Sequence, residues 1–431
     1  MRFQSLPQFE PAARRLIRKT RILRLYSPIW PTTTCFVLFF TIAVSLAAPA
    51  AHSQTKRARK HPQKLSRPIR LDAGVTYRRN PASGELEIAS PGGIGAVGER
   101  DQPSGTRAIR VVTQVVPITC SAFGSDGTPL RDLTLRDFRA YDDGIERPIV
   151  LFDARSAEPA SIALVIDASP SVLRDSQEMK DAASALIEGL APADEIAIVD
   201  FSAHTYLQTG FTSVRELLRR AIARVDVRQI LGDTGGSNIY EAVYLTARKL
   251  FPGRTGRKAI VLLTDGQDSG LGLTLDPASA SPHPWNSENR LTFDDVTREL
   301  ASHDIQIFAV STENRPRVMT RDWLTARRDT SLLMLDARDV GIPPYTLYLA
   351  ELVRRSGGDL YFLREADTLA ETFRRIAARV GTEYSLGISP LLGANSSAPS
   401  PGWHQLRVEV IGRGNVSVVH RAAYYVPAST Q

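Results

Sequence analysis

Short apolar runs alternate with amphipathic stretches through the middle of the chain, between residues 161 and 382. The apolar runs predict buried strands, and the stretches between them carry apolar residues at helical spacing. The predicted strands cover residues 162–166, 195–201, 206–211, 259–264, 305–310 and 359–362. The predicted helices cover residues 177–190, 214–224, 239–251, 293–302, 345–355 and 369–380. This order predicts an α/β fold with a doubly wound, mostly parallel sheet.

Polar stretches interrupt this pattern twice. Residues 270–290 are rich in Pro, Ser and Asn, and residues 312–344 are rich in Arg, Asp and Thr. Long stretches of this kind are usually loops. We therefore expect two surface insertions in the α/β region.

Both flanks of the α/β region have the pattern of β-strands, with Asp142-Asp143-Gly144 as a tight-turn signal. The predicted flanking strands cover residues 109–122, 138–141, 148–152, 384–388, 405–411 and 416–425. Two interpretations stay open. The flanks form one β-sandwich into which the α/β domain is inserted, or they form two separate β modules.

The first residues carry the pattern of an export signal. A basic region precedes an apolar run at 35–48, and small residues follow it. The run is short for a transmembrane helix, which needs about 20 apolar residues. We expect a signal peptide cleaved near Ala50 or Ser53, with an uncleaved membrane anchor as the alternative. Export would make this a bacterial secreted, periplasmic or cell-envelope protein.

These patterns divide the chain into segments of different character. The segments are 1–53 (signal peptide or membrane anchor), 54–107 (basic, Gly- and Pro-rich linker, mostly disordered, with a weak strand pair within 69–90), 108–158 (β-strand module), 159–382 (α/β domain) and 383–431 (β segment, pairing with 108–158 in the single-sandwich interpretation).

Charge and cysteine content refine this picture. The formal net charge is +7, but residues 1–70 hold 14 basic residues and one acid, so the remainder has a net charge of −6. A mildly acidic folded region gives no support to nucleic acid as a partner. The cysteines are Cys35 and Cys120. Signal cleavage would leave Cys120 without a disulfide partner, and we expect it to be buried in a strand.

Candidate chemistry lies where two predicted strands end. Asp167 ends one strand and is followed by Ser169 and Ser171, while Asp265 ends another, and a Gly-Gly-Ser237 loop precedes a helix. Ligands bind at the carboxyl ends of strands in doubly wound sheets, so neighbouring strands would bring these residues together. Two close carboxylates repel unless a proton or cation lies between them. Carboxylates and hydroxyls suit Mg²⁺ or Mn²⁺.

The combination Asp167-Ala-Ser169-Pro-Ser171, Ser237 and Thr264-Asp265-Gly266 resembles the metal-ion-dependent adhesion site of von Willebrand factor A (VWFA) domains, over residues 161–382. The resemblance implies that Ser169, Ser171 and Ser237 contact the metal directly. It implies that Asp167 and Asp265 act directly or through water. Mg²⁺ or Mn²⁺ is the implied cofactor, with Ca²⁺ as a further candidate, and the implied partner is a protein or surface ligand that offers an acidic residue.

Two positions depart from the family pattern. Pro170 stands where Gly is common, and Ser237 stands where Thr is usual. Proline fixes φ and lacks an N–H, and serine has more rotamer freedom than threonine. We expect these departures to affect metal affinity more than the fold.

The whole chain resembles, more narrowly, the exported acidobacterial VWFA-related proteins. Residues 133–144, before the A domain, carry this resemblance together with residues 382–390 and 423–427 in the tail.

Other interpretations of the same residues stay open. Ser169 and Ser171 could cap the following helix, Ser237 could cap its own helix, and Asp233 and Asp268 are expected to be solvated loop acids. A serine hydrolase would need Ser171 beside His204, but the sequence has no Gly-x-Ser-x-Gly elbow, zinc-protease motif or phosphate loop. A metal-free envelope scaffold is the remaining alternative, and the membrane would be a partner only through an uncleaved amino-terminal segment.

Overall fold

The computed structural model describes most of the chain from residue 65 to residue 426. The residues it does not describe are 1–64, 82–83, 90–114, 126–127, 155–158, 226–235, 272, 274–289, 321–322, 325, 328–329, 364–368, 381–383, 391, 393–398, 415 and 427–431. The predicted signal or anchor at 1–53 and most of the predicted insertion at 270–290 lie outside the described residues. Among the helices that are described, none has the length and apolar character needed to cross a membrane. The described residues, all of which lie between 61 and 431, belong to one compact unit.

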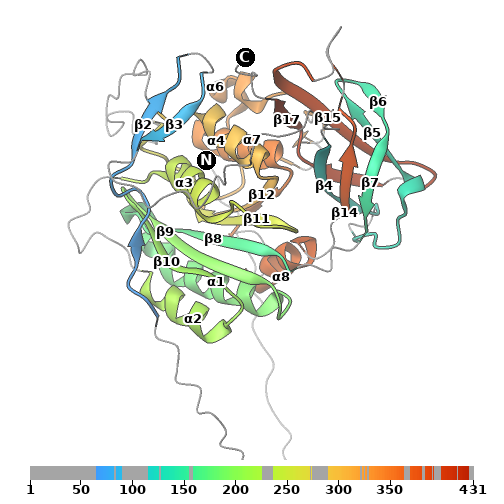
Figure 1. Cartoon of the computed structure of the whole chain (residues 1–431). Coiled ribbons are helices and arrows are strands. Elements are labelled where there is room, and N and C mark those ends of the chain that lie inside the picture. Colours follow the sequence, from blue (N-terminus) through green and yellow to red (C-terminus); the bar gives the residue numbers. More distant parts are fainter. Residues whose placement is uncertain are drawn as a thin grey trace, which may run out of the picture. The chain divides into compact units, whose positions relative to one another are not determined.

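A seven-stranded sheet forms the centre of the α/β region (Figure 1). Its strand order is β1-β10-β9-β8-β11-β12-β13, and β9, β8, β11, β12 and β13 run parallel. The bounds are β1 (Ile69–Arg70), β8 (Ser161–Asp167), β9 (Glu195–Phe201), β10 (Thr205–Thr212), β11 (Lys258–Thr264), β12 (Ile305–Ser311) and β13 (Asp359–Phe362). The chain moves outward from β8 in one direction through β9 and in the other through β11. The order therefore reverses at β8, as in a doubly wound fold.

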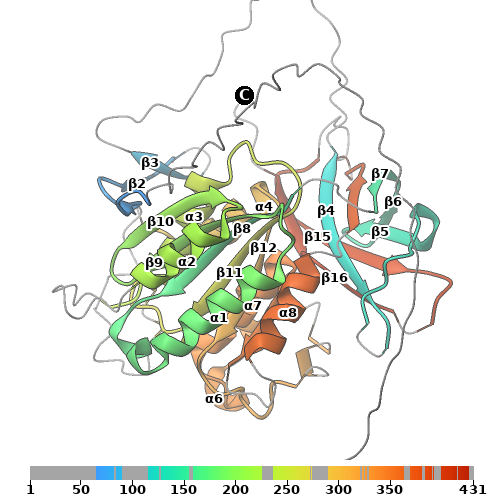
Figure 2. The same cartoon turned by 90° about the horizontal axis from the view of Figure 1, so that it is seen from below.

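Helices cover both faces of this sheet (Figures 1 and 2). On one face Leu164 and Val261 pack against α1 (Ser176–Gly189), α2 (Arg215–Arg224) and α8 (Leu369–Val380). On the other face Val165 and Leu262 pack against α3 (Ile239–Leu250), α4 (Phe293–Ser302) and α7 (Pro344–Ser356). Because successive strand residues point to opposite faces, a continuous apolar strand needs both layers. The predicted α/β fold class is confirmed.

The flanking segments form two four-stranded antiparallel sheets, in the orders β16-β4-β14-β7 and β17-β15-β5-β6. The strands are β4 (Val116–Phe123), β5 (Phe138–Asp142), β6 (Ile145–Arg147), β7 (Ile149–Asp153), β14 (Tyr384–Ile388), β15 (Gly402–Val410), β16 (Ser417–His420) and β17 (Ala423–Val426), and a short 3₁₀ helix, η1 (Leu135–Asp137), precedes β5. Strands from before the α/β region pair with strands from after it in both sheets, through β16-β4-β14-β7 in one and β15-β5 in the other, so one β-sandwich spans the insertion. Its shared core includes Cys120, which is fully buried as predicted.

The segment before residue 90 contains the expected strand pair and packs against the α/β domain. β1 pairs with β10 at the edge of the central sheet, and β2 (Thr76–Arg79) forms a hairpin with β3 (Leu86–Ala89). Leu71 and Leu86 are buried in the core of the α/β region, and Arg79 pairs with Asp295 of α4 at 2.7 Å. The strand pair expected within 69–90 is therefore present, whereas its packing against the α/β domain was not predicted. Its apolar residues are too few to form a core alone, but they complete one that the α/β domain provides.

The second predicted insertion is only partly a surface loop. Residues 312–344 contain a 3₁₀ helix, η4 (Leu332–Met334), and a short helix, α6 (Ala337–Val340). Three apolar side chains within this polar stretch, Met319, Leu332 and Ile342, are buried against α7 and its neighbours. Spaced apolar residues thus fix the insertion to the domain although its composition is polar.

Candidate metal centre

The predicted site residues lie at one edge of the central sheet. β8 and β11 are adjacent and parallel, with Ile166 opposite Leu263, so Asp167, the last residue of β8, and Asp265, which follows β11, are at neighbouring strand ends. The adjacency that the sequence analysis required is therefore present at the point where the strand order reverses. Ser237, which precedes α3, reaches the same edge because its hydroxyl donates to Asp167 Oδ2 at 3.4 Å.

Asp167 is held in a fixed orientation. Its Oδ1 accepts a hydrogen bond from the Ser169 backbone N–H at 2.9 Å, and its Oδ2 accepts one from the Thr264 hydroxyl at 2.7 Å. The carboxylate is 2% exposed. The orientation of Asp167 is thus fixed by one group that follows its own strand, β8, and by one group at the end of the adjacent strand, β11.

The two serines of the first loop connect the carboxylates. Ser169 Oγ lies 3.0 Å from Ser171 Oγ, and the Ser171 side chain hydrogen-bonds to Asp265. Asp265 Oδ1 also accepts the Gln267 backbone N–H at 2.9 Å. Ser169 is buried, whereas Ser171 is exposed. All five predicted residues therefore belong to one hydrogen-bonded group that opens to solvent at Ser171.

Burial dominates the electrostatics of this group. Removal from water raises the pKa of Asp167 to about 7, and the neighbouring Asp265 carboxylate adds to the rise. Burial also raises the pKa of Asp265, against the hydrogen bond from Ser171. Two buried carboxylates that repel each other retain protons or attract a cation. The site therefore disfavours its own fully ionised, metal-free form.

The loop that carries Ser237 and the loop that follows β11 are joined by residues that were not predicted as part of the site. Ser269 Oγ accepts the Ser237 backbone N–H at 3.2 Å, and the Ser269 N–H donates to the Ser237 carbonyl at 2.7 Å. Thr264, which orients Asp167, was likewise not assigned a role. A hydroxyl directly before Asp265 was a signal available in the sequence, whereas no local pattern identifies Ser269.

Gly236 allows this close contact between the loops. Its φ is +92°, and a Cβ at this position would overlap Ser269 Oγ. We expect Gly236→Ala to displace Ser237 and to weaken metal binding by at least about tenfold, the loss typical of a disturbed second shell. Gly253→Ala is the matched control, because Gly253 has φ +75° but open space around it. Calorimetric titration with Mn²⁺ measures both variants, and equal affinities would contradict this role for Gly236.

Pro170, the first departure from the family pattern, fits the observed backbone. It is the first residue of a 3₁₀ helix, η2 (Pro170–Asp175), which leads into α1. The first N–H of a helix has no intrahelical partner, so proline costs little there. Ser169 and Ser171 on either side keep their hydroxyls within the site.

The helix-cap interpretations do not describe these residues. The residue before α1 is Asp175 and the residue before α3 is Asn238, and neither side chain accepts a capping hydrogen bond.

The acid at the start of α3 is Asp268, whose Oδ2 accepts the Tyr240 backbone N–H at 3.3 Å. Asp268 is 1% exposed, and burial raises its pKa to about 6. Its prediction as a solvated loop acid was wrong, because the loop after β11 folds back onto α3. Asp233 lies outside the described residues.

His204 does not make the contact with Ser171 that a serine hydrolase would require. Its Nδ1 lies 2.8 Å from Asp72 Oδ2, and Arg70 lies at the same distance from that nitrogen. Both partners come from the amino-terminal segment beside β10. Ser171 instead contacts Ser169 and Asp265.

Residues 162–267 match the family model of the von Willebrand factor type A domain. The match begins in β8 and ends just after Asp265, so it spans both carboxylates and the loop with Ser237. This chain contains a von Willebrand factor type A domain. The match confirms the resemblance at the level of the A domain and does not bear on the narrower acidobacterial group. Metal ligation by the five residues stays a prediction.

Several solved structures are similar to the chain. An aerotolerance-related membrane protein from Bacteroides fragilis is 16% identical, with 51% of this chain and 98% of that one covered and a TM-score of 0.35. A von Willebrand factor type A protein from Catenulispora acidiphila is 13% identical, with coverages of 68% and 73% and a TM-score of 0.34. A proximal thread matrix protein from the mussel byssus, described with a zinc-occupied adhesion motif, is 16% identical, with coverages of 56% and 49% and a TM-score of 0.36.

These similarities are too weak to support an inference about ligand or activity. The domain assignment rests on the family match and on the observed sheet order. Comparison with curated proteins gives no significant match.

Proposed function

We propose that the A domain binds one hard divalent cation through Asp167, Ser169, Ser171, Ser237 and Asp265 and presents it to an acidic group on a partner. The observation that carries this proposal is the burial of two mutually repelling carboxylates beside three serine hydroxyls at one sheet edge. A dication neutralises both acids also at a pH at which they have lost their protons.

The donor set fits the proposed metal. All donors are hard oxygens, which suit Mg²⁺ and Mn²⁺, and Ca²⁺ is the further candidate because it also takes oxygen ligands. Ser171 is the exposed member, so the metal is reached from solvent on that side. A coordination position on that side, filled by water in the free protein, is where a partner's carboxylate would bind.

The proposal includes export and excludes an enzymatic step. The basic, apolar and small-residue order of residues 1–53 supports export to the periplasm, cell envelope or medium. The partner is then a protein or surface ligand rather than nucleic acid. Adhesion or protein–protein interaction follows from the metal-bridged mode of binding.

Thermal unfolding tests the metal-binding step. We expect Mg²⁺ and Mn²⁺ to raise the melting temperature of the chelator-treated protein, because a ligand that binds only the folded state stabilises it. Asp167→Ala should abolish the shift. Asp181→Asn is the control, since Asp181 is an exposed aspartate on α1 that lies outside the site. Absence of a shift in the wild-type protein would favour the metal-free scaffold.

Partner capture tests the second step. Wild-type protein should retain an envelope partner in Mg²⁺ and release it in EDTA, whereas Asp167→Ala should not retain it in either buffer. Equal retention of the partner in EDTA and in Mg²⁺ would contradict a metal-bridged contact. Covalent labelling of Ser171 by a serine-reactive probe, lost in His204→Ala, would instead support the hydrolase.

A further inference from the structure

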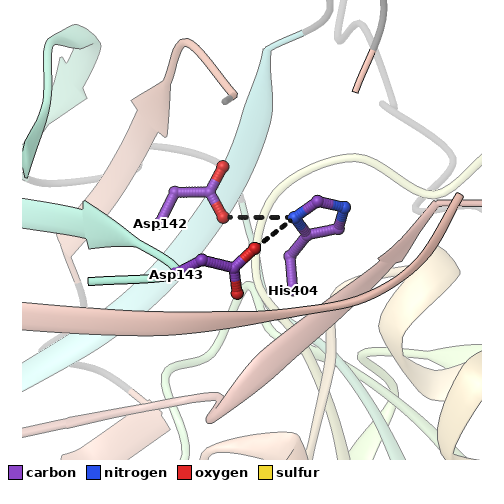
Figure 3. Close-up of side chains that lie close together, drawn as sticks. All are labelled: Asp142, Asp143 and His404. Atoms are coloured by element: carbon purple, nitrogen blue, oxygen red, sulfur yellow. Dashed lines mark hydrogen bonds and ion pairs between the residues drawn. The ribbon is translucent and has the colours of Figure 1, made fainter. Parts of the chain in front are cut away.

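The β-sandwich carries a second group of metal-ligand side chains, Asp142, Asp143 and His404 (Figure 3). Asp142 is the last residue of β5, Asp143 follows in the turn to β6, and His404 is on the neighbouring strand β15. One ligand atom from each residue lies within 4.8 Å of the others. In the sequence, Asp142-Asp143-Gly144 predicts only a hairpin turn, and His404 is 261 positions away from Asp143.

The two ring nitrogens of His404 have different partners. Its Nε2 lies 2.8 Å from the Ser400 carbonyl oxygen. A carbonyl oxygen only accepts hydrogen bonds, so Nε2 donates to it and Nδ1 is the nitrogen that lies toward the two carboxylates. Nδ1 lies 2.8 Å from Asp143 Oδ2 and 3.5 Å from Asp142 Oδ1. Nδ1 and two carboxylate oxygens therefore converge, and either a proton on Nδ1 or a metal ion can bridge them.

Each of the three side chains is also held by a group outside the cluster. Asp142 Oδ2 accepts a hydrogen bond from the Tyr424 hydroxyl at 2.9 Å, and Asp143 Oδ1 accepts one from the Gln405 backbone N–H at 2.8 Å. The His404 ring stacks on Tyr424, with centroids 4.9 Å apart. Outer contacts of this kind orient the ligands of metal sites, and a histidine ligand commonly donates its second N–H to a backbone carbonyl. Here each side chain is anchored by one atom and directs another inward.

Burial leaves one approach to the cluster. His404 is 2% exposed and Asp142 is fully buried, whereas the side chain of Asp143 is 40% exposed. Asp143 adopts φ +49° in the turn, a left-handed conformation that Asp and Asn tolerate better than most residues. The turn thus brings an accessible carboxylate over two buried ligands.

We propose that Asp142, Asp143 and His404 bind a divalent transition metal, with Zn²⁺ the ion that best suits one imidazole nitrogen and two carboxylate oxygens. Tetrahedral Zn²⁺ with bonds of about 2.0–2.2 Å places its ligand atoms about 3.3 Å apart, so the observed separations of 2.8 and 3.5 Å require only small shifts. Three protein ligands leave a fourth position for water at the exposed side. The ion clamps the β5–β6 turn to β15, two segments that the α/β insertion separates in the sequence.

Titration of the full chain with Co²⁺ and Zn²⁺ tests this site. Asp167→Ala is used as the background, so that the candidate metal centre of the A domain does not contribute. We expect one equivalent to bind, with a Co²⁺ absorption spectrum of tetrahedral nitrogen and oxygen ligation. His404→Gln should abolish binding. His303→Gln is the control, because His303 lies on the α/β domain beside Glu299 and should leave binding unchanged.

A conservative second variant keeps the test decisive if His404→Gln does not fold. Asp143→Asn retains the left-handed turn and the acceptor for Gln405 but removes an anionic ligand, so affinity should fall at least tenfold. Absence of binding in the Asp167→Ala background, or unchanged binding in both cluster variants, overturns the proposal and leaves His404 hydrogen-bonded to the carboxylates without a metal ion. Neither result bears on Mg²⁺ or Mn²⁺ binding by the A domain.

Discussion

Gly358→Ala should destabilise the protein by about 3 kcal/mol or more, at the upper end of the cost of overpacking. Gly358 lies between α7 and β13, where its backbone passes directly against β12. A Cβ at this position would overlap the Ile307 carbonyl oxygen. The obstacle is backbone of a central strand rather than a flexible side chain. The added methyl group can therefore be accommodated only by separating β12 from the start of β13.

Urea unfolding gives the free energies that check this expectation. Gly210→Ala is the matched control, since Gly210 is exposed on β10 and a Cβ there would meet nothing within 4 Å. The control should change the free energy of unfolding by no more than about 0.5 kcal/mol. Equal effects of the two substitutions would show that the backbone contact of Gly358 is not close in solution.

The metal-free protein should lose stability as the pH rises from about 4 to about 7. The folded-state pKa values of Asp167 and Asp268 are about 7 and about 6, both above the ordinary 3.8. The folded state therefore binds protons more tightly than the unfolded state in this window. Their stabilising effect is complete below the unfolded pKa and is lost as the pH passes the folded pKa. For Asp167 the loss is on the order of 4 kcal/mol.

Saturating Mg²⁺ should restore the part of this loss that belongs to Asp167. The cation neutralises the site at high pH, whereas protons compete with it at low pH. Asp268 caps α3 outside the donor set, so Asp268→Asn should remove a different part of the pH dependence, one that Mg²⁺ does not affect. Free energies of unfolding in EDTA and in Mg²⁺, measured between about pH 4 and about pH 8, test both statements. A flat profile in EDTA would contradict the burial of ionisable carboxylates.

Local pattern predicted the α/β domain and its site to a useful extent. The helices at 293–302 and 369–380 and the strands at 195–201 and 359–362 have the predicted bounds, because their apolar periodicity is strong and their ends are marked. Asp167 and Asp265 converge because the ends of adjacent parallel strands share one edge of a sheet. Predicting this convergence requires only the order of the strands in the sheet, and the alternation of strands with helices along the chain leaves few possible orders.

The features that the sequence did not reveal depend on contacts between distant residues. Leu71 and Leu86 pack in a core that the α/β domain supplies, so the sequence of their own segment predicts no more than a weak strand pair within a linker. Asp268 is buried because its loop folds back onto α3. The cluster around His404 forms only when β5 and β15 pair across the inserted domain. The composition of a segment and the spacing of its residues do not predict which distant segment it pairs with.

Three separate loops should hold one hard dication at the carboxyl ends of β8 and β11. A crystal structure with Mn²⁺ and its anomalous scattering tests this directly. The anomalous peak should lie within about 2.3 Å of the hydroxyl oxygens of Ser169, Ser171 and Ser237. It should lie close enough to Asp167 and Asp265 for direct or water-mediated contact. An absence of signal at this edge in millimolar Mn²⁺, with the five side chains in place, would contradict the claim.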